Sequence, residues 1–395
     1  MILEFLEPIH IIFKKIVNNY TVIMLGPSGS GKTVFLSSMY KKLSTQGEHG
    51  FFLEVDGSEK RKRLNNIYTE IAVDEKWPRG TTYSEVSEWT FTCRVQTENL
   101  PIYSACTFTY LDYAGGRITD EMEEEDSEFE SKIKEADALL CLLDGQRLSA
   151  FMRNEKLGKV WAVNDLPNML NIMQSSLKPI HFVISKWDIL ESNFTLEQIR
   201  NKLLQIDEFR DLVKLRNKAD SPSAVRLIPV SAVGKGFANL QPDGRMAKTG
   251  ELPKPFQVEV PLACVLPDVI ENKLAELMEK KQKELNTPIE VKLDLNFLEQ
   301  LFQLFGGGMK ILQQLLPKKY QFAEDILQKL IEIAEEPIQK KQEAAIRRTD
   351  ELRRKQAASI KAVENEETAL NHVINCFISI NNKLDYTFPE SNIKL

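Results

Sequence analysis

The chain has 395 residues with 27% charged and 43% hydrophobic residues, which is ordinary for a globular protein, and its length allows two or three domains. Its net charge of -6 gives no reason to expect general nucleic-acid binding. Five cysteines without CxxC spacing argue against a structural zinc and predict a reducing, cytoplasmic location.

Residues 1–19 form the first predicted element, an N-terminal helix whose apolar side chains spread around all sides. The segment carries Glu4 and Glu7 and lacks the basic start of a signal peptide. No segment of the chain has the length and apolarity of a transmembrane helix. We therefore expect the first helix to pack against another element, and membrane contact is not the favoured interpretation.

The next segment joins a predicted buried strand, residues 20–25, to a predicted helix that begins near Val34. Between them lies GPSGSGKT, residues 26–33. Glycines let backbone N–H groups surround phosphate oxygens, and the helix N-terminus adds a favourable dipole. Lys32 would contact the β- and γ-phosphates, and Thr33 would ligate Mg²⁺. The predicted phosphate-binding residues are Gly26, Ser28, Gly29, Ser30, Gly31, Lys32 and Thr33.

A predicted first switch follows at residues 77–82, before a predicted edge strand at residues 88–96 whose alternate positions are apolar. A threonine in such a loop gives its hydroxyl to Mg²⁺ and its N–H to the γ-phosphate. Thr82 is the candidate metal ligand, and Thr81 is the alternative. Arg79, three residues before Thr82, is a candidate catalytic residue that would neutralise charge on the transferred phosphoryl group. The competing interpretation of Arg79 is a solvated loop arginine.

The predicted strand at residues 103–111 ends in the sequence Asp-Tyr-Ala-Gly, residues 112–115. An aspartate at the end of this strand faces the phosphate site. Asp112 would hold Mg²⁺ through water, and the N–H of Gly115 would reach the γ-phosphate.

Predicted strands at residues 136–144, 179–184 and 226–230 complete the pattern, and the second of them ends in Ser185-Lys186-Trp187-Asp188. The carboxylate of Asp188 can accept hydrogen bonds from guanine N1–H and from its exocyclic amine. Adenine offers neither donor and would leave a buried charge unpaired. The stem of Lys186 can lie over the purine. Ser231 and Ala232 follow the last strand, where the Ala232 N–H could meet guanine O6.

Together these motifs resemble those of Ras-like P-loop GTPases of the translation-factor-related class, and within it the bacterial double-GTPase families of conflict and defence systems. The resemblance covers about residues 20–285. It implies an α/β fold, a P-loop GTPase domain with a mostly parallel central sheet and flanking helices, that binds GTP, GDP and Mg²⁺. Two positions depart from the pattern. Ser185 replaces the usual Asn or Thr and shortens the reach to the phosphate loop. Gly116 replaces the water-orienting Gln of many small GTPases, which argues against fast intrinsic hydrolysis.

Beyond the guanine motifs, a Gly/Pro-rich stretch at residues 234–255 predicts a long surface loop, and helix signals at about residues 266–285 close the nucleotide domain, residues 20–285. Residues 286–395 predict an α-helical C-terminal region. The leading hypothesis is a Mg²⁺-dependent GTPase switch with a protein partner that binds the switch regions or the C-terminal helices. The alternatives are a nucleotide-locked structural module with negligible hydrolysis and a membrane-associated GTPase.

Overall fold

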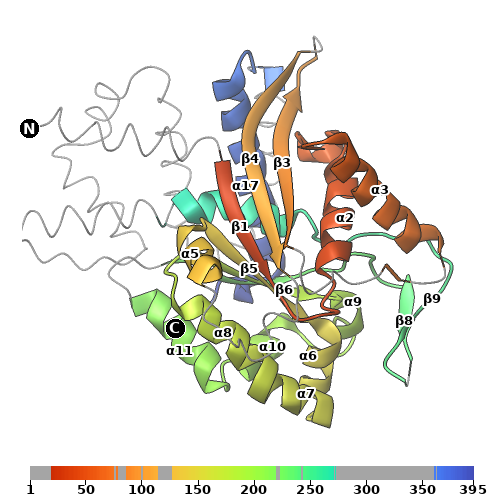
Figure 1. Cartoon of the computed structure of the whole chain (residues 1–395), viewed down its shortest axis with the longest axis vertical. Coiled ribbons are helices and arrows are strands. Elements are labelled where there is room, and N and C mark those ends of the chain that lie inside the picture. The colour runs from red at the N-terminus through yellow and green to blue at the C-terminus, as the bar shows by residue number, and fades with distance from the viewer. Residues whose placement is uncertain are drawn as a thin grey trace, which may run out of the picture.

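The computed structural model describes residues 19–74, 77–78, 86–98, 101–113, 127–218, 223–241, 243–270, 272, 360–361 and 363–395. Its centre is a seven-stranded sheet in the order β2-β3-β4-β1-β5-β6-β7 (Figure 1). The strands of this sheet are β1 (Asn19–Leu25), β2 (Phe52–Val55), β3 (Val86–Gln96), β4 (Ile102–Tyr113), β5 (Ala138–Asp144), β6 (Ile180–Ser185) and β7 (Val225–Pro229). A separate antiparallel hairpin contains β8 (Ala238–Leu240) and β9 (Met246–Lys248).

Helices connect most of these strands. Before β5 they are α2 (Lys32–Leu43), η1 (Gly47–His49), α3 (Ser58–Val73) and α5 (Ser127–Glu135). Between β5 and β7 they are α6 (Gly145–Met152), α7 (Lys156–Val160), the π-helical turn η2 (Trp161–Asp165), α8 (Leu166–Gln174), α9 (Trp187–Leu190), α10 (Leu196–Leu203) and α11 (Asp207–Lys218). Residues 260–270 are also helical. The chain ends with α17 (Glu366–Thr387) and η4 (Pro389–Ser391).

Both faces of the sheet are covered, because alternate side chains of a strand point to opposite faces. In β1, Val22 and Met24 join a core cluster that also includes side chains of α2, of α17 and of residues 260–270. Ile23 and Leu25 join the opposite cluster, with side chains of α6, α8 and α10. Every residue of β5 is buried, as its continuous apolar sequence predicts.

Strands β4, β1, β5, β6 and β7 run parallel, so their carboxyl ends lie at one edge of the sheet. This edge is where open α/β sheets bind ligands. The predicted α/β class with a mostly parallel sheet is confirmed. The predicted edge position of residues 88–96 is wrong, because β3 pairs with β4 on one side and with β2 on the other. Its predicted alternation is confirmed by buried Trp89, Phe91, Cys93 and Val95.

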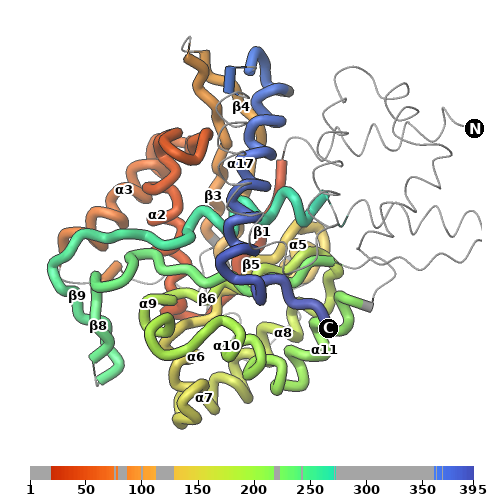
Figure 2. The backbone as a smooth tube through the Cα atoms, turned by 180° about the vertical axis from the view of Figure 1, so that it is seen from behind, coloured from red at the N-terminus to blue at the C-terminus, as the bar shows by residue number. Residues whose placement is uncertain are grey.

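The C-terminal helix α17 packs against β4 and β3 (Figure 2). The Phe377 ring lies 5.2 Å from the Phe51 ring and 5.9 Å from the Phe108 ring, measured between centroids. The described end of the chain therefore shares a core with the sheet. The predicted N-terminal helix falls almost entirely on residues 1–18, which lie outside the described residues. Residues 286–359 of the predicted C-terminal helical region also lie outside them, as do residues 273–285 of the helix predicted to close the nucleotide domain.

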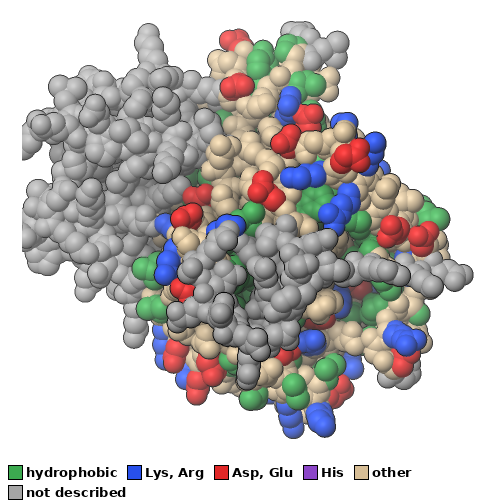
Figure 3. All heavy atoms as spheres, in the orientation of Figure 1, with side chains coloured by type: hydrophobic (Ala, Val, Ile, Leu, Met, Phe, Trp, Pro, Cys, Tyr) green, Lys and Arg blue, Asp and Glu red, His purple; other side chains and the backbone are tan. Residues whose placement is uncertain are grey.

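The predicted loop at residues 234–255 contains the β8–β9 hairpin, and the helix predicted from about residue 266 already begins at residue 260. Within the described part of the chain, no helix combines the length and apolarity needed to cross a membrane. Figure 3 shows acidic and basic side chains interspersed over the described part of one face.

Candidate nucleotide-binding site

The phosphate loop connects β1 to α2, and Gly31 immediately precedes the helix with a φ of 91° that favours glycine. A glycine is also required at position 26, because a Cβ there would lie 2.8 Å from Ser30 Oγ and 3.1 Å from the Leu142 Cβ. The loop therefore turns tightly over the carboxyl end of β1 and leads directly into the N-terminus of α2. This is the geometry in which backbone N–H groups surround an anion.

Lys32 is the first residue of α2, and its side chain turns back into the loop. Its Nζ donates a 2.6 Å hydrogen bond to the carbonyl oxygen of Gly26, and the residue is 7% exposed. Burial lowers the pKa of Lys32, while the nearby carboxylate of Asp112 acts in the opposite direction. A phosphate beside Lys32 would supply the counter-charge that this buried ammonium favours.

Asp112 lies near the end of β4 and is 1% exposed. Burial raises its pKa to about 6, although Lys32 and Arg63 act to lower it. Among the described residues, neither its Oδ1 nor the buried Oγ of Ser30 has a hydrogen-bond partner. An unpaired buried acceptor is costly, so both atoms fit a site that a ligand completes.

The donors present fit Mg²⁺. The described residues contain no cluster of three or more His, Cys, Asp or Glu side chains able to enclose a metal. Mg²⁺ commonly uses one or two carboxylates together with substrate phosphates. Asp112 and the hydroxyl of Thr33 could provide the protein ligands for such an ion.

Lys186 connects the Ser185–Asp188 loop after β6 to the phosphate loop, residues 26–31, after β1. Its Nζ lies 3.0 Å from both carboxylate oxygens of Asp144 and donates a 3.0 Å hydrogen bond to the carbonyl oxygen of Gly29. Ser185 does not make this connection, because its hydroxyl donates to the carbonyl oxygen of Leu143 at 3.1 Å. From the sequence, Asp144 was predicted only as the end of a strand. The available signal was a carboxylate at the end of an otherwise apolar strand, β5.

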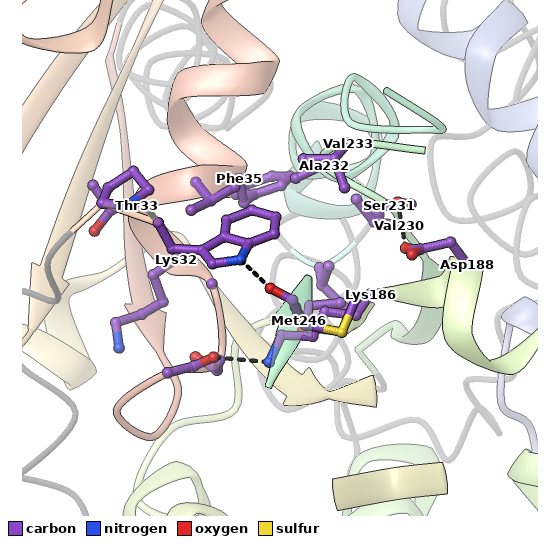
Figure 4. Close-up of a pocket in the computed structure, with 18 of the residues that line it drawn as sticks. Lys32, Thr33, Phe35, Lys186, Asp188, Val230, Ser231, Ala232, Val233 and Met246 are labelled. Carbon is purple, nitrogen blue, oxygen red and sulfur yellow. Dashed lines mark hydrogen bonds between the residues drawn. The ribbon is translucent and has the colours of Figure 1, made fainter. Parts of the chain in front are cut away.

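Asp188 and Ser231 come from the loops after β6 and β7, and they are hydrogen-bonded to each other (Figure 4). Ser231 Oγ donates to Asp188 Oδ1 at 2.5 Å and accepts a 2.7 Å bond from the N–H of Gly234. Burial raises the pKa of Asp188, and the bond from Ser231 lowers it. Backbone pairing of Ser231 with Phe256 fixes the second loop. Together these contacts orient the carboxylate that would recognise guanine.

One pocket of about 560 Å³ brings these loops together. Its lining includes the predicted residues Ser28, Gly29, Ser30, Gly31, Lys32, Thr33, Ser185, Lys186, Asp188, Ser231 and Ala232. Gly26 and Asp112 do not line this pocket. Gly26 accepts the hydrogen bond from Lys32, and the carboxylate of Asp112 acts to raise the pKa of Lys32. Trp77 and Pro78, the first two residues of the predicted first switch, also line the pocket. Arg245 and Met246 line it as well, and the sequence predicted no role for them. The predicted residues Arg79, Thr81, Thr82, Gly115 and Gly116 lie outside the described residues.

No family model matches the sequence, and no curated protein matches it. Similar solved structures include the S. cerevisiae Ski7 GTPase-like domain bound to GDP and inorganic phosphate, with 16% identity and a TM-score of 0.32 over 62% of this chain and 49% of that chain. The Chaetomium thermophilum signal recognition particle receptor SRb-GTP/SRX complex has 14% identity and a TM-score of 0.31 over 55% of this chain and 92% of that chain. A putative nucleolar GTP-binding protein 1 from Plasmodium falciparum has 11% identity and a TM-score of 0.33 over 69% and 97%.

The chain thus spans about half the length of the Ski7 domain that it matches. With identities and TM-scores this low, these likenesses carry no weight for the function of this chain, which is inferred from its own residues.

Proposed function

We propose that this protein is a Mg²⁺-dependent GTP-binding and GTP-hydrolysing switch. The observation that supports it best is the convergence of three strand-end loops on one pocket: the phosphate loop after β1, the Ser185–Asp188 loop after β6 and the Ser231 loop after β7. One end of this pocket holds a buried ammonium, that of Lys32, and the other holds a carboxylate, that of Asp188. A molecule with phosphates at one end and hydrogen-bond donors at the other satisfies both.

The choice of guanine rests on Asp188. Ser231 occupies one side of its Oδ1, and the remaining acceptor positions of the carboxylate are available to the N1–H and exocyclic amine of a guanine. Adenine would offer no donor to these positions, so binding it would leave a half-buried carboxylate without the compensation it needs.

Hydrolysis in this proposal depends on residues around the γ-phosphate. When bound, Mg²⁺ neutralises charge on the phosphate oxygens. Thr33, Thr82 and Asp112 would hold the ion, and Lys32 would contact the β- and γ-phosphates. The N–H of Gly115 would donate to the γ-phosphate, and the guanidinium of Arg79 would stabilise charge on the transferred phosphoryl group.

The second candidate is a nucleotide-locked module that binds GTP and hydrolyses it negligibly. Gly116 favours it, because glycine has no side chain to orient a water molecule. A role in a bacterial conflict or defence system, with a protein partner for the switch regions or C-terminal helices, is supported by the motif resemblance alone.

GTP turnover by the full-length protein tests the proposal, measured with MgCl₂ and with excess EDTA. Lys32→Ala should abolish Mg²⁺-dependent GTP binding and turnover because the phosphates lose their buried cation. Lys41→Ala provides a matched control, since Lys41 is an exposed lysine of the same helix. Wild-type turnover by Lys32→Ala would refute the proposed site. Tight GTP binding without single-turnover hydrolysis by the wild type would favour the locked module.

A further inference from the structure

The end of the chain lies against the two loops that contain the proposed guanine-binding residues. These guanine loops are residues 185–188 after β6 and residues 231–234 after β7. Figure 2 shows α17 running along the sheet from the turn between β3 and β4 toward α10. After α17, η4 contacts both α10 and β7. The sequence predicted a helical region at residues 286–395 and gave no reason to expect its end beside the guanine loops.

Phe388 is the C-cap residue of α17, and its ring contacts an aromatic residue attached to each guanine loop. The centroids of the Phe388 and Trp187 rings are 5.9 Å apart, and the rings are nearly perpendicular, at 89°. Trp187 itself belongs to the first guanine loop. The Phe256 ring lies 6.4 Å from the Phe388 ring, at 80°. Phe256 pairs with Ser231 of the second loop through two backbone hydrogen bonds, of 3.1 and 2.8 Å. One ring therefore joins both loops.

Both contacts lead to Asp188, the residue proposed to recognise guanine. Trp187 immediately precedes it, at the first position of α9, and only 4% of Trp187 is exposed. The N–H of Trp187 donates a 3.0 Å hydrogen bond to the carbonyl oxygen of Val230, just after β7. From the second loop, Ser231 Oγ donates to Asp188 Oδ1 at 2.5 Å. A displacement of the Trp187 or Phe256 ring would therefore move the carboxylate or the hydroxyl that orients it.

The C-terminal segment, residues 388–393, is held by contacts of its own. The N–H of Phe388 donates to the carbonyl oxygen of Leu384 in α17 at 2.7 Å. Ile393 is 1% exposed, and its N–H donates a 2.9 Å hydrogen bond to the carbonyl oxygen of Val225 at the start of β7. The partly buried Phe388 ring packs against the core clusters on both faces of the sheet. Phe388 is therefore attached to α17 and to the sheet, so it can support the guanine loops from a fixed position.

We propose that Phe388 is a positioning residue of the guanine site. Acting through Trp187 and Phe256, it holds the carboxylate of Asp188 in the orientation that guanine requires. This inference rests on the proposed function. Edge-to-face aromatic pairs have a preferred geometry, so they fix the direction of a neighbouring ring as well as filling space. Guanine recognition is sensitive to this positioning, because hydrogen bonds weaken steeply as their angle departs from linearity. Base selectivity therefore depends on the attachment of the C-terminal segment.

Competition of unlabelled GDP and IDP against a fluorescent GDP analogue, bound to the full-length protein, tests this role. Inosine lacks the exocyclic amine of guanine, so the ratio of the two dissociation constants reports the hydrogen bond from that amine to Asp188. Phe388→Leu keeps an apolar side chain but removes the ring. It should weaken GDP binding about fivefold and lower the IDP-to-GDP ratio about threefold, the range expected for one misplaced hydrogen bond. Phe388→Tyr restores the ring and should restore both values.

Phe377→Leu is the matched control, because it makes the same substitution in α17 at a ring that contacts Phe51 and Phe108. It should lower the melting temperature of the apo protein while leaving the GDP affinity and the IDP-to-GDP ratio at their wild-type values. Phe256→Leu removes the ring on the other side of the contact and should lower the ratio as Phe388→Leu does. It tests the inference without changing the end of the chain.

A wild-type ratio in both Phe388→Leu and Phe256→Leu would overturn the inference while leaving the proposed function intact. An equal fall of the ratio in Phe377→Leu would also overturn it, because general destabilisation would then explain the effect. Wild-type protein that binds no guanine nucleotide, indistinguishable from Lys32→Ala, would overturn both the inference and the proposed function.

Discussion

Replacement of the buried Asp112 by asparagine should stabilise the nucleotide-free protein while weakening its Mg²⁺-dependent binding of GTP. Burial raises the pKa of this carboxyl from 3.8 to about 6, so at pH 7 the folded protein holds a charge that its environment disfavours. At 1.36 kcal/mol per pH unit, the elevation corresponds to at most ~3 kcal/mol. We expect Asp112→Asn to increase the free energy of unfolding by about 1–3 kcal/mol at pH 7.

The sign of the pH dependence follows from the raised pKa. The wild-type protein gains stability from Asp112 as the pH falls through 6, because the folded state then takes up a proton more readily than the unfolded state. The advantage of Asp112→Asn should therefore fall by roughly half between pH 7 and pH 5. Urea unfolding in EDTA at several pH values measures it. GTP titration with MgCl₂ measures the accompanying loss of binding.

Asp211→Asn is the control, because Asp211 is an exposed residue of α11 and its replacement should change stability by less than about 0.5 kcal/mol. If Asp112→Asn lowered the stability of the apo protein at pH 7, the argument that its charge is destabilising without a ligand would be wrong. Unchanged Mg²⁺-dependent binding would remove Asp112 from the metal site.

Two further predictions concern the reaction and the buried ion pair between Arg226 of β7 and Asp268 of the helix at residues 260–270. Arg79→Ala should lower the single-turnover rate of GTP hydrolysis by on the order of a hundredfold, with little change in GTP affinity. Arg79→Lys should restore little of this rate, because an ammonium cannot donate the two parallel hydrogen bonds of a planar guanidinium. A wild-type rate for Arg79→Ala in rapid-quench assays would exclude this role. Burial alone would raise the pKa of Asp268, but the bidentate contact from Arg226, at 2.6 and 2.7 Å, lowers it to about 2. The stabilisation of the folded protein by the charged form of Asp268 is therefore present above pH 4 and is lost as the pH falls toward 2. Asp268→Asn should lower the free energy of unfolding by about 3 kcal/mol at pH 7, because the buried guanidinium of Arg226 would lose its two shortest carboxylate contacts and keep the longer one, 3.4 Å to Asp385. Unchanged stability in urea would contradict this.

The sequence predicted the strands whose signal is local. β1, β5, β6 and β7 are buried on both faces, so their apolar runs identify them without knowledge of the fold. The strand β2 was missed because four residues are too few to show a period. The hairpin was missed because β8 and β9 have three residues each, and contacts with Trp77 and α3 fix its position.

The candidate site likewise contains residues that the sequence predicted and residues that it did not. The phosphate and guanine motifs are contiguous, and the structure brings Lys32, Lys186 and Asp188 to one pocket. Asp144 and Trp77 are positioned by partners far along the chain. Asp144 binds Lys186, 42 residues away, and Trp77 binds Met246, 169 residues away. The spacing of residues in a single sequence does not reveal such distant pairs.

Nucleotide selectivity tests whether Asp188 selects guanine. Affinities of the wild type and of Asp188→Asn should be measured for fluorescent analogues of GTP, ATP and XTP. The wild type should strongly prefer GTP. Asp188→Asn should weaken GTP binding by ~2–3 kcal/mol and shift preference toward XTP, because the amide replaces one acceptor with a donor. Equal affinity of the wild type for ATP and GTP would show that Asp188 does not select guanine.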